Sequence, residues 1–363
     1  MKHAYMKKTI GIILLATVSL VAMAQEKRMA VVEFSTCYLR LKPDYESPLE
    51  TQELMGTVVE IVGEQSYWRE VVTPQPYRAW CTDQGLVEMS ADELKAYEEA
   101  PKVMFCDLYG HIYKEASMDS PTICDLVGGD LLRLTTVKDN TDKALKKALK
   151  SKWTKVMLPS GKTGFVPSKQ LKPHKGFRSI SMDEGSAESI SSETTEDIIA
   201  QAEKLLGVPY LWGGMSAKGV DCSGLVRISH IMNGILLPRN ASQQVKCGER
   251  VEIPRQARND KAESRDDKGE ARNDKGEARN DKAEASYNRE IALNATSNLE
   301  RGDLVFFGTP ATDEKPMRIT HVGIYLGENK IIHSSHRVRI NSLIPGDDDY
   351  YENSHRLVAA IRL

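Results

Sequence analysis

The chain has 363 residues, of which 28% are charged and 40% hydrophobic, and its formal net charge is −2 at pH 7. This composition is typical of a globular protein long enough for two or three domains. The near-neutral balance argues against a nucleic-acid partner, because the excess of basic residues that phosphate backbones attract is missing.

The first 24 residues have the three-part layout of a secretory signal peptide. Lysines at positions 2, 7 and 8 precede an apolar run over 10–21, and Ala22-Met23-Ala24 provides a small-residue cleavage site. The apolar run is shorter than the ~20 residues that a membrane span needs. We therefore expect removal of residues 1–24, export to the periplasm or cell envelope, and no stable membrane span after that removal.

Export matters for the six cysteines, because an oxidising compartment permits disulfides. No CxxC or Cys/His spacing typical of a zinc site occurs, so we expect neither a metal site nor a cofactor. Four cysteines lie in strand-like stretches, where they are expected to be small buried side chains and where pairing stays open: Cys37, Cys81, Cys106 and Cys124.

Two stretches, 28–95 and 100–175, repeat one pattern of short alternating strands broken by Gly, Pro and Asp. The pattern predicts a small all-β barrel twice over, and the pair resembles bacterial SH3-like domains. The lysine-rich segment 139–152 in the second copy is interpreted as a solvated loop. The Ser-, Glu- and Gly-rich segment 176–195 is interpreted as a linker.

The C-terminal region 196–363 changes to a helical and then to a strand pattern. A helix is predicted over 195–207, capped by Thr194 or Thr195, and a second helix begins at Cys222. Four strand-like stretches follow: RGDLVFFG, THVGIYLG, NKIIHSS and LVAAIRL. Helices followed by a run of antiparallel strands predict an α+β domain.

A low-complexity insert over 254–286 interrupts this domain. Residues 257–284 repeat a heptad of the type ARNDKAE four times, and each unit offers only alanine or glycine for an apolar seam. A coiled coil needs larger apolar residues, so we expect a disordered surface insert.

Cys222 follows a Gly-rich loop and opens a helix, where the helix dipole and free N–H groups stabilise negative charge. A free thiol holds only a small fraction of thiolate at neutral pH, so a nucleophilic Cys222 needs a base. Among the eight histidines, His230 lies too far along the same helix to reach it. His336 and His355 are expected to be structural or solvated.

His321 and His333 lie on two strands that a hairpin is expected to join. If a three-residue loop over 327–329 joins the strands, Leu326 pairs with Lys330 and the two imidazoles share one face. A two-residue loop would place them on opposite faces. In the favourable register His321 acts as the base and His333 orients it. The alternative is a buried structural cysteine among scattered surface histidines.

The stretches PYLWGG, DCSGLVR, RGDLVFFG, THVGIYLG and KIIHSS resemble the NlpC-type cell-wall cysteine peptidases, a papain-like family. The resemblance covers 196–363 without the insert. It implies that Cys222 is the nucleophile, His321 the base and His333 the third polar residue.

The whole architecture resembles the γ-D-glutamyl-L-diamino acid endopeptidases. That resemblance implies a papain-like catalytic domain preceded by two SH3-like barrels, and cleavage between D-Glu and the diamino acid of peptidoglycan stem peptides. It implies that Asp221 and Ser223 bind the free L-Ala amine, that Tyr210 lies near the oxyanion and that the first barrel adds a tyrosine and an acid. The remaining candidates are Trp212 as a pocket wall or a core residue, Ser242 as a further substrate contact, and Tyr109 or Tyr113 as the added tyrosine.

The sequence therefore predicts a monomeric cysteine peptidase acting on peptidoglycan stem peptides or murein peptide fragments. The rival interpretation is a non-catalytic peptidoglycan-binding protein that uses its SH3-like domains, and a third is an acyltransferase or amidase on the same scaffold.

Overall fold

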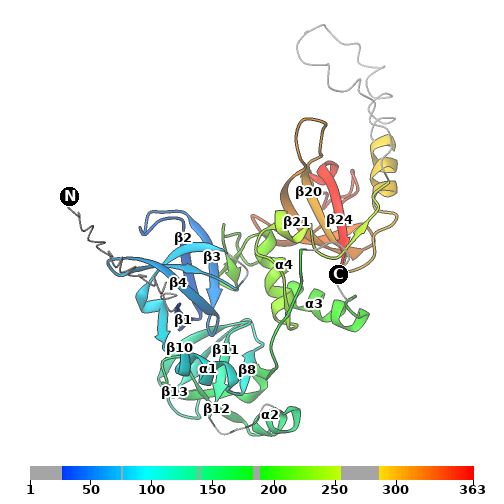
Figure 1. Ribbon diagram of the computed structural model, residues 1–363. Helices are drawn as coiled ribbons and strands as arrows, with labels where there is room; N and C mark the ends of the chain where they lie inside the picture. The colour runs from blue at the N-terminus through cyan, green and yellow to red at the C-terminus, as the bar shows by residue number, and fades with distance from the viewer. Residues whose placement is uncertain are drawn as a thin grey trace, which may run out of the picture.

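The computed structural model describes residues 27–74, 77–135, 137, 139, 141–182, 189–254 and 286–363. The predicted signal peptide and the heptad repeat lie outside the described residues. Within the described ranges, no helix is long and apolar enough to cross a membrane. Figure 1 shows an N-terminal β domain in blue, a second in cyan to green, and a C-terminal domain ending in red.

The first domain is a seven-stranded sheet in the order β3-β2-β6-β5-β4-β1-β7. Its strands are β1 (Arg28–Val32), β2 (Thr36–Arg40), β3 (Leu49–Leu54), β4 (Val58–Gln65), β5 (Trp68–Val72), β6 (Arg78–Thr82) and β7 (Leu86–Met89). Helix α1 (Ala91–Glu99) follows, and a capping box between Ser90 and Glu93 begins it.

The second domain repeats the first, with the order β10-β9-β13-β12-β11-β8-β14. Its strands are β8 (Lys102–Phe105), β9 (Tyr109–Tyr113), β10 (Thr122–Val127), β11 (Leu131–Leu134), β12 (Trp153–Met157), β13 (Thr163–Pro167) and β14 (Leu171–His174). Adding seven to each strand number of the first sheet gives the second, so the predicted all-β duplication is confirmed. The solvated-loop prediction for 139–152 is wrong. That segment holds α2 (Asp142–Ala148), because Thr141 caps it and Leu145 is fully buried.

The C-terminal domain packs helices against a six-stranded antiparallel sheet, β19-β24-β20-β21-β22-β23. Its helices are α3 (Ser192–Lys204), α4 (Cys222–Ile231) and α5 (Ala241–Gln244), and residues 286–295 are also helical. Its sheet strands are β19 (Glu249–Val251), β20 (Leu304–Thr309), β21 (Arg318–Gly327), β22 (Lys330–Ser335), β23 (Arg337–Ser342) and β24 (Leu357–Arg362). The α+β prediction for this domain is confirmed, although β19 and β23 were not predicted.

The segment predicted as a linker contains regular structure. Strand β15 (Arg178–Ser179) pairs in parallel with β18 (Ile235–Leu236) of the C-terminal domain. Helix α3 begins earlier than predicted, because Ser191 and neither threonine is its N-cap: the Ser191 hydroxyl accepts the Thr194 N–H at 3.2 Å.

The β21–β22 hairpin reaches the favourable register by a route that the sequence did not predict. The turn holds two residues, Glu328 and Asn329, both with positive φ, as two-residue hairpin turns prefer. Gly327 therefore pairs with Lys330, but the register shifts between Tyr325 and Gly327, so Ile324 still pairs with Ile332. This bulge restores the predicted face.

All three domains contribute to one hydrophobic core. Leu54 from the first sheet and Val127 and Leu131 from the second join the apolar residues of α3, α4 and the C-terminal sheet. Lys218 reinforces the junction, because it bonds Ser35 of the first domain at 2.9 Å and Asp125 of the second at 2.7 Å.

The shared core predicts that the domains unfold together. Leu54→Ala should cost about 2–5 kcal/mol and lower the temperature at which the C-terminal domain unfolds, measured by calorimetry with hydrogen exchange. Leu41→Ala, at a side chain that is 52% exposed, is the control. Loss of the first domain alone, with the C-terminal transition unchanged, would contradict a shared core.

Candidate active site

Cys222 is the first residue of α4 and is partly exposed. A short hairpin, β16 (Met215–Ser216) and β17 (Gly219–Val220), leads into the helix. Asp221 is the N-cap, and its carboxylate accepts the Gly224 N–H at 2.7 Å. A Cβ at Gly224 would overlap the Gly214 carbonyl oxygen, so only glycine lets the helix start this close to the loop.

The surroundings of Cys222 favour the uncharged thiol. Burial, followed by the charge of Asp221, raises the pKa of Cys222 to about 11. The backbone of Val322 contributes a hydrogen bond that opposes this rise. Because Val322 follows His321 in β21, the thiol lies beside the strand that carries the first candidate histidine.

His321 and His333 form a hydrogen-bonded pair, with 2.8 Å between Nε2 of His321 and Nδ1 of His333. The fully buried His333 lies opposite Gly323. A Cβ at position 323 would lie 3.2 Å from the Cβ of His333. Tyr351 covers both imidazoles, with ring centroids 5.6 Å from His321 and 4.6 Å from His333.

Both imidazoles are held in their neutral forms. Burial, then the positive charges of His333 and Arg339, lower the pKa of His321 to about 3. Burial also lowers the pKa of His333 to about 4. Since the thiol is also favoured uncharged, the resting set is a thiol and two neutral imidazoles.

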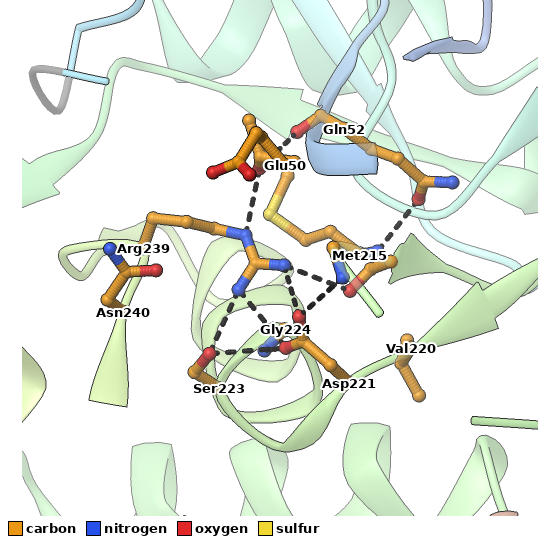
Figure 2. A network of polar contacts seen from close by, with 12 residues as sticks. Glu50, Gln52, Met215, Val220, Asp221, Ser223, Gly224, Arg239 and Asn240 are labelled. Carbon is orange, nitrogen blue, oxygen red and sulfur yellow. Dashed lines mark hydrogen bonds and ion pairs between the residues drawn. The ribbon is translucent and has the colours of Figure 1, made fainter. Parts of the chain in front are cut away.

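A buried arginine organises the other side of the helix start (Figure 2). Arg239 is 3% exposed and donates to both carboxylate oxygens of Asp221, at 3.1 and 2.6 Å. It also donates to the Ser223 hydroxyl at 2.9 Å and, across the domain boundary, to the Thr51 hydroxyl of β3 at 2.8 Å. The ion pair therefore joins the N-terminus of α4 to the first sheet.

Asp221 and Ser223, the residues predicted to bind the substrate amine, make these contacts within the protein. One carboxylate oxygen accepts bonds from Ser223, Gly224 and Arg239, and the other accepts from Gly213 and Arg239. The Ser223 hydroxyl both donates to Asp221 and accepts from Arg239. Both side chains are buried and hydrogen-bonded within the protein.

A partly exposed carboxylate lies next to this network instead. Glu50, the residue before Thr51, accepts a 2.6 Å hydrogen bond from the Tyr77 hydroxyl. Burial and Glu50 raise the pKa of Tyr77 to about 12, and the side chain of Asn240, next to Arg239, hydrogen-bonds the same phenol. The Glu50 backbone contacts Gly213. A Cβ at position 213 would lie 3.0 Å from the carbonyl carbon of Glu50. The first domain thus supplies an acid from β3 and a tyrosine from the loop before β6.

The other predicted residues occupy varied positions. Burial, then Cys222, raise the pKa of Tyr210 to about 12, which places that phenol near the thiol. Trp212 is 67% exposed and therefore not a core residue, and Ser242 is exposed on α5. Tyr109 and Tyr113 lie on β9 of the second sheet and not in the first domain, where the loop before β6 carries Tyr77.

The remaining histidines lie elsewhere, as expected. His230 is buried in α4, with Nδ1 2.7 Å from the Val226 carbonyl. His336 and His355 are exposed.

Sequence reasoning missed Glu50, Tyr77, Arg239 and Tyr351. Arg239 had one signal, its place in the apolar stretch ILLPRN. Glu50 and Tyr77 of the first domain gave none, because their proximity to the start of α4 depends on how the domains pack.

Removing Arg239 should destabilise the chain strongly. Arg239→Met leaves the Asp221 carboxylate buried without its cation, at a cost of about 3–5 kcal/mol, and should alter the rate at which iodoacetamide alkylates Cys222. Arg301→Met removes an exposed pair with Glu196 and should cost under about 1 kcal/mol. Denaturant unfolding and alkylation kinetics test this, and equal effects of the two variants would contradict the role assigned to Arg239.

Comparisons with known proteins identify a family that the C-terminal domain matches. Residues 207–356 match the model of the NlpC/P60 family. A dipeptidyl-peptidase 6 from Lysinibacillus sphaericus is 24% identical over 336 residues, which cover 92% of this chain and 98% of that relative. A gamma-D-glutamyl-L-lysine dipeptidyl-peptidase from Bacillus subtilis strain 168 is 30% identical over 159 residues, covering 44% of this chain and 38% of that relative.

A solved structure shows the same fold along nearly the whole chain. It is the crystal structure of an NlpC/P60 family protein from Bacillus cereus ATCC 10987, with a TM-score of 0.62 and 19% identity, covering 92% of this chain and 99% of that chain. The C-terminal part of this protein, residues 207–356, is therefore an NlpC/P60 domain.

Proposed function

We propose that the chain is a cysteine endopeptidase that hydrolyses the γ-D-glutamyl–diamino acid bond of peptidoglycan stem peptides, in murein peptide turnover or recycling. The observation that carries the proposal is the 2.8 Å hydrogen bond between His321 and His333, because His321 lies on β21, the strand beside Cys222 at the start of α4. The names of the relatives, two of them gamma-D-glutamyl-L-lysine dipeptidyl-peptidases, support the substrate class.

In the proposed reaction His321 takes the thiol proton while the sulfur of Cys222 attacks the γ-carbonyl carbon. The Cys222 N–H at the helix start and the Tyr210 hydroxyl stabilise the oxyanion. His321 then protonates the leaving amine of the diamino acid as the C–N bond breaks. Water, deprotonated by His321, attacks the thioester and releases the acyl part and the thiol.

Glu50 and Tyr77 are proposed to bind a free N-terminal L-Ala amine, replacing Asp221 in that role. An ammonium group needs a charged or hydrogen-bonding partner when it leaves water. Glu50 is partly exposed beside the loop that leads into α4, whereas the Asp221 carboxylate is buried against Arg239. The exposed Trp212 is proposed to line the same side.

The two β domains are proposed to be SH3-like barrels, the first of which closes the site at the amine end. We further propose that the chain acts in the periplasm or cell envelope after export. Relatives such as the bifunctional muramidase/DL-endopeptidase CwlT of Bacillus subtilis support an envelope location by name.

The substrate assignment predicts that the chain cleaves L-Ala-γ-D-Glu-diaminopimelate and does not cleave the same peptide with an acetylated N-terminus. Mass spectrometry of the digests should show L-Ala-D-Glu only from the free-amine peptide, and none with Cys222→Ala. Binding of both peptides without cleavage would contradict the enzyme and favour a peptidoglycan-binding protein.

Glu50→Gln removes the charge for the substrate ammonium and should lower kcat/KM about 10- to 100-fold, the value of a charge-assisted hydrogen bond. Glu46→Gln, at an exposed position of the same domain, should keep wild-type kinetics. An unchanged kcat/KM in Glu50→Gln would remove Glu50 from the amine site.

The lowered pKa of His321 sets the pH dependence. An imidazole whose pKa lies below the ordinary 6.5 stays neutral, and able to accept a proton, as the pH falls through 6.5. The acid limb of kcat/KM should therefore lie below pH 6.5, measured on the free-amine peptide. An apparent pKa at or above 6.5 would mean that His321 is not the buried base.

A further inference from the structure

His333 has a second hydrogen bond, to a residue that the proposed reaction does not use. Nε2 of His333 lies 2.9 Å from Oδ1 of Asn341 on β23. Asn341 is 7% exposed and comes from the strand that pairs with the His333 strand. The side chains therefore form a chain from His321 through His333 to Asn341, running away from Cys222.

The orientation of the Asn341 amide is fixed by its other end. Its Nδ2 donates to the Asp349 backbone carbonyl at 2.6 Å. A carbonyl oxygen only accepts, so the NH₂ group must face Asp349 and the amide oxygen must face His333. The Asp349 carbonyl is itself held, since it also accepts the Ser342 N–H at 3.0 Å.

This orientation determines the proton on each imidazole. Because the Asn341 oxygen only accepts, Nε2 of His333 carries a hydrogen. A neutral His333 then has its lone pair on Nδ1, which accepts from Nε2 of His321 at 2.8 Å. Nε2 of His321 therefore carries the hydrogen that it donates to His333, and a neutral His321 has its lone pair on Nδ1.

Both imidazoles are neutral, as this assignment of the protons requires. Burial, with the positive charge of Arg339, favours neutral His333, although the Asn341 bond opposes this. His333 pairs with Arg339 across β22 and β23, and Tyr351 packs edge-on at 4.6 Å. These neighbours offer no carboxylate that would hold His333 as a cation.

We propose that Asn341 is a positioning residue that fixes the hydrogen of His321 on Nε2 and so leaves Nδ1 as the proton acceptor for Cys222. The hydrogen on Nε2 stays in place throughout the reaction, and only Nδ1 exchanges protons with the thiol and the leaving amine. The catalytic consequence rests on the proposed function, whereas the tautomer assignment does not.

The tautomers can be read directly by NMR of the full chain labelled with ¹⁵N-histidine, with His321→Gln and His333→Gln spectra for assignment. Wild type should show both histidines as Nε2–H tautomers at neutral pH. Asn341→Leu removes the acceptor and should populate Nδ1–H forms in His333 and His321. Asn341→Asp keeps an acceptor oxygen and should retain the Nε2–H forms.

Kinetics on the free-amine peptide supply the second readout. Asn341→Leu should lower kcat at least about 100-fold, the order of effect of a wrong imidazole tautomer, with KM unchanged because Asn341 touches no substrate. Asn341→Asp should restore most of kcat. Asn298→Leu, which removes an exposed asparagine bonded to the Glu252 carbonyl, is the matched control and should change neither readout.

A wild-type His321 in the Nδ1–H form, or an Asn341→Leu variant with wild-type tautomers and kcat, would overturn the proposal. The NMR readout needs no turnover. If the wild type cleaves no peptide but shows the Nε2–H forms, the proposed function fails while the tautomer assignment stands.

Discussion

The positive charge of Arg239 is the constraint on which the arrangement of the site depends. Folding removes this guanidinium from water, so its partners must be in place or the cost reaches several kcal/mol. The guanidinium donates hydrogen bonds to Asp221 and Ser223 at the start of α4 and to Thr51 in the first sheet. The position of the helix that carries Cys222 and the docking of the N-terminal domain are therefore parts of one structural requirement.

That requirement explains why the site combines buried charge on one side with neutral groups on the other. The Asp221 carboxylate adds to burial in raising the pKa of Cys222, and the charge of Arg239 opposes this rise only in part. Cys222, His321 and His333 are held in uncharged forms, and proton transfer among them depends on the direction of hydrogen bonds rather than on a standing ion pair. Such a set keeps its order only if each donor and acceptor has a fixed partner.

Local signals sufficed to predict that Cys222 begins a helix, that the side chains of His321 and His333 meet, and that the domain is α+β, because a loop-to-helix turn and strand alternation are visible in short stretches of sequence. The proposed amine site could not be predicted in this way. Asp221 stands beside Cys222 in the sequence, but its carboxylate is used by Arg239, and Tyr77 reaches the site only through domain packing. The favourable hairpin register was expected only with a three-residue turn, yet it occurs with a two-residue turn, because the pairing shift that follows Tyr325 is invisible to periodicity.

The measurement that tests the central claim most directly is intact-protein mass spectrometry of an acid-quenched reaction with L-Ala-γ-D-Glu-diaminopimelate, followed by peptide mapping. The account predicts a transient adduct equal in mass to L-Ala-D-Glu less water, located on Cys222 as a thioester and absent when the peptide amine is acetylated. Turnover of the peptide without any adduct on Cys222, or an adduct on another residue, would contradict the assignment of Cys222 as the nucleophile.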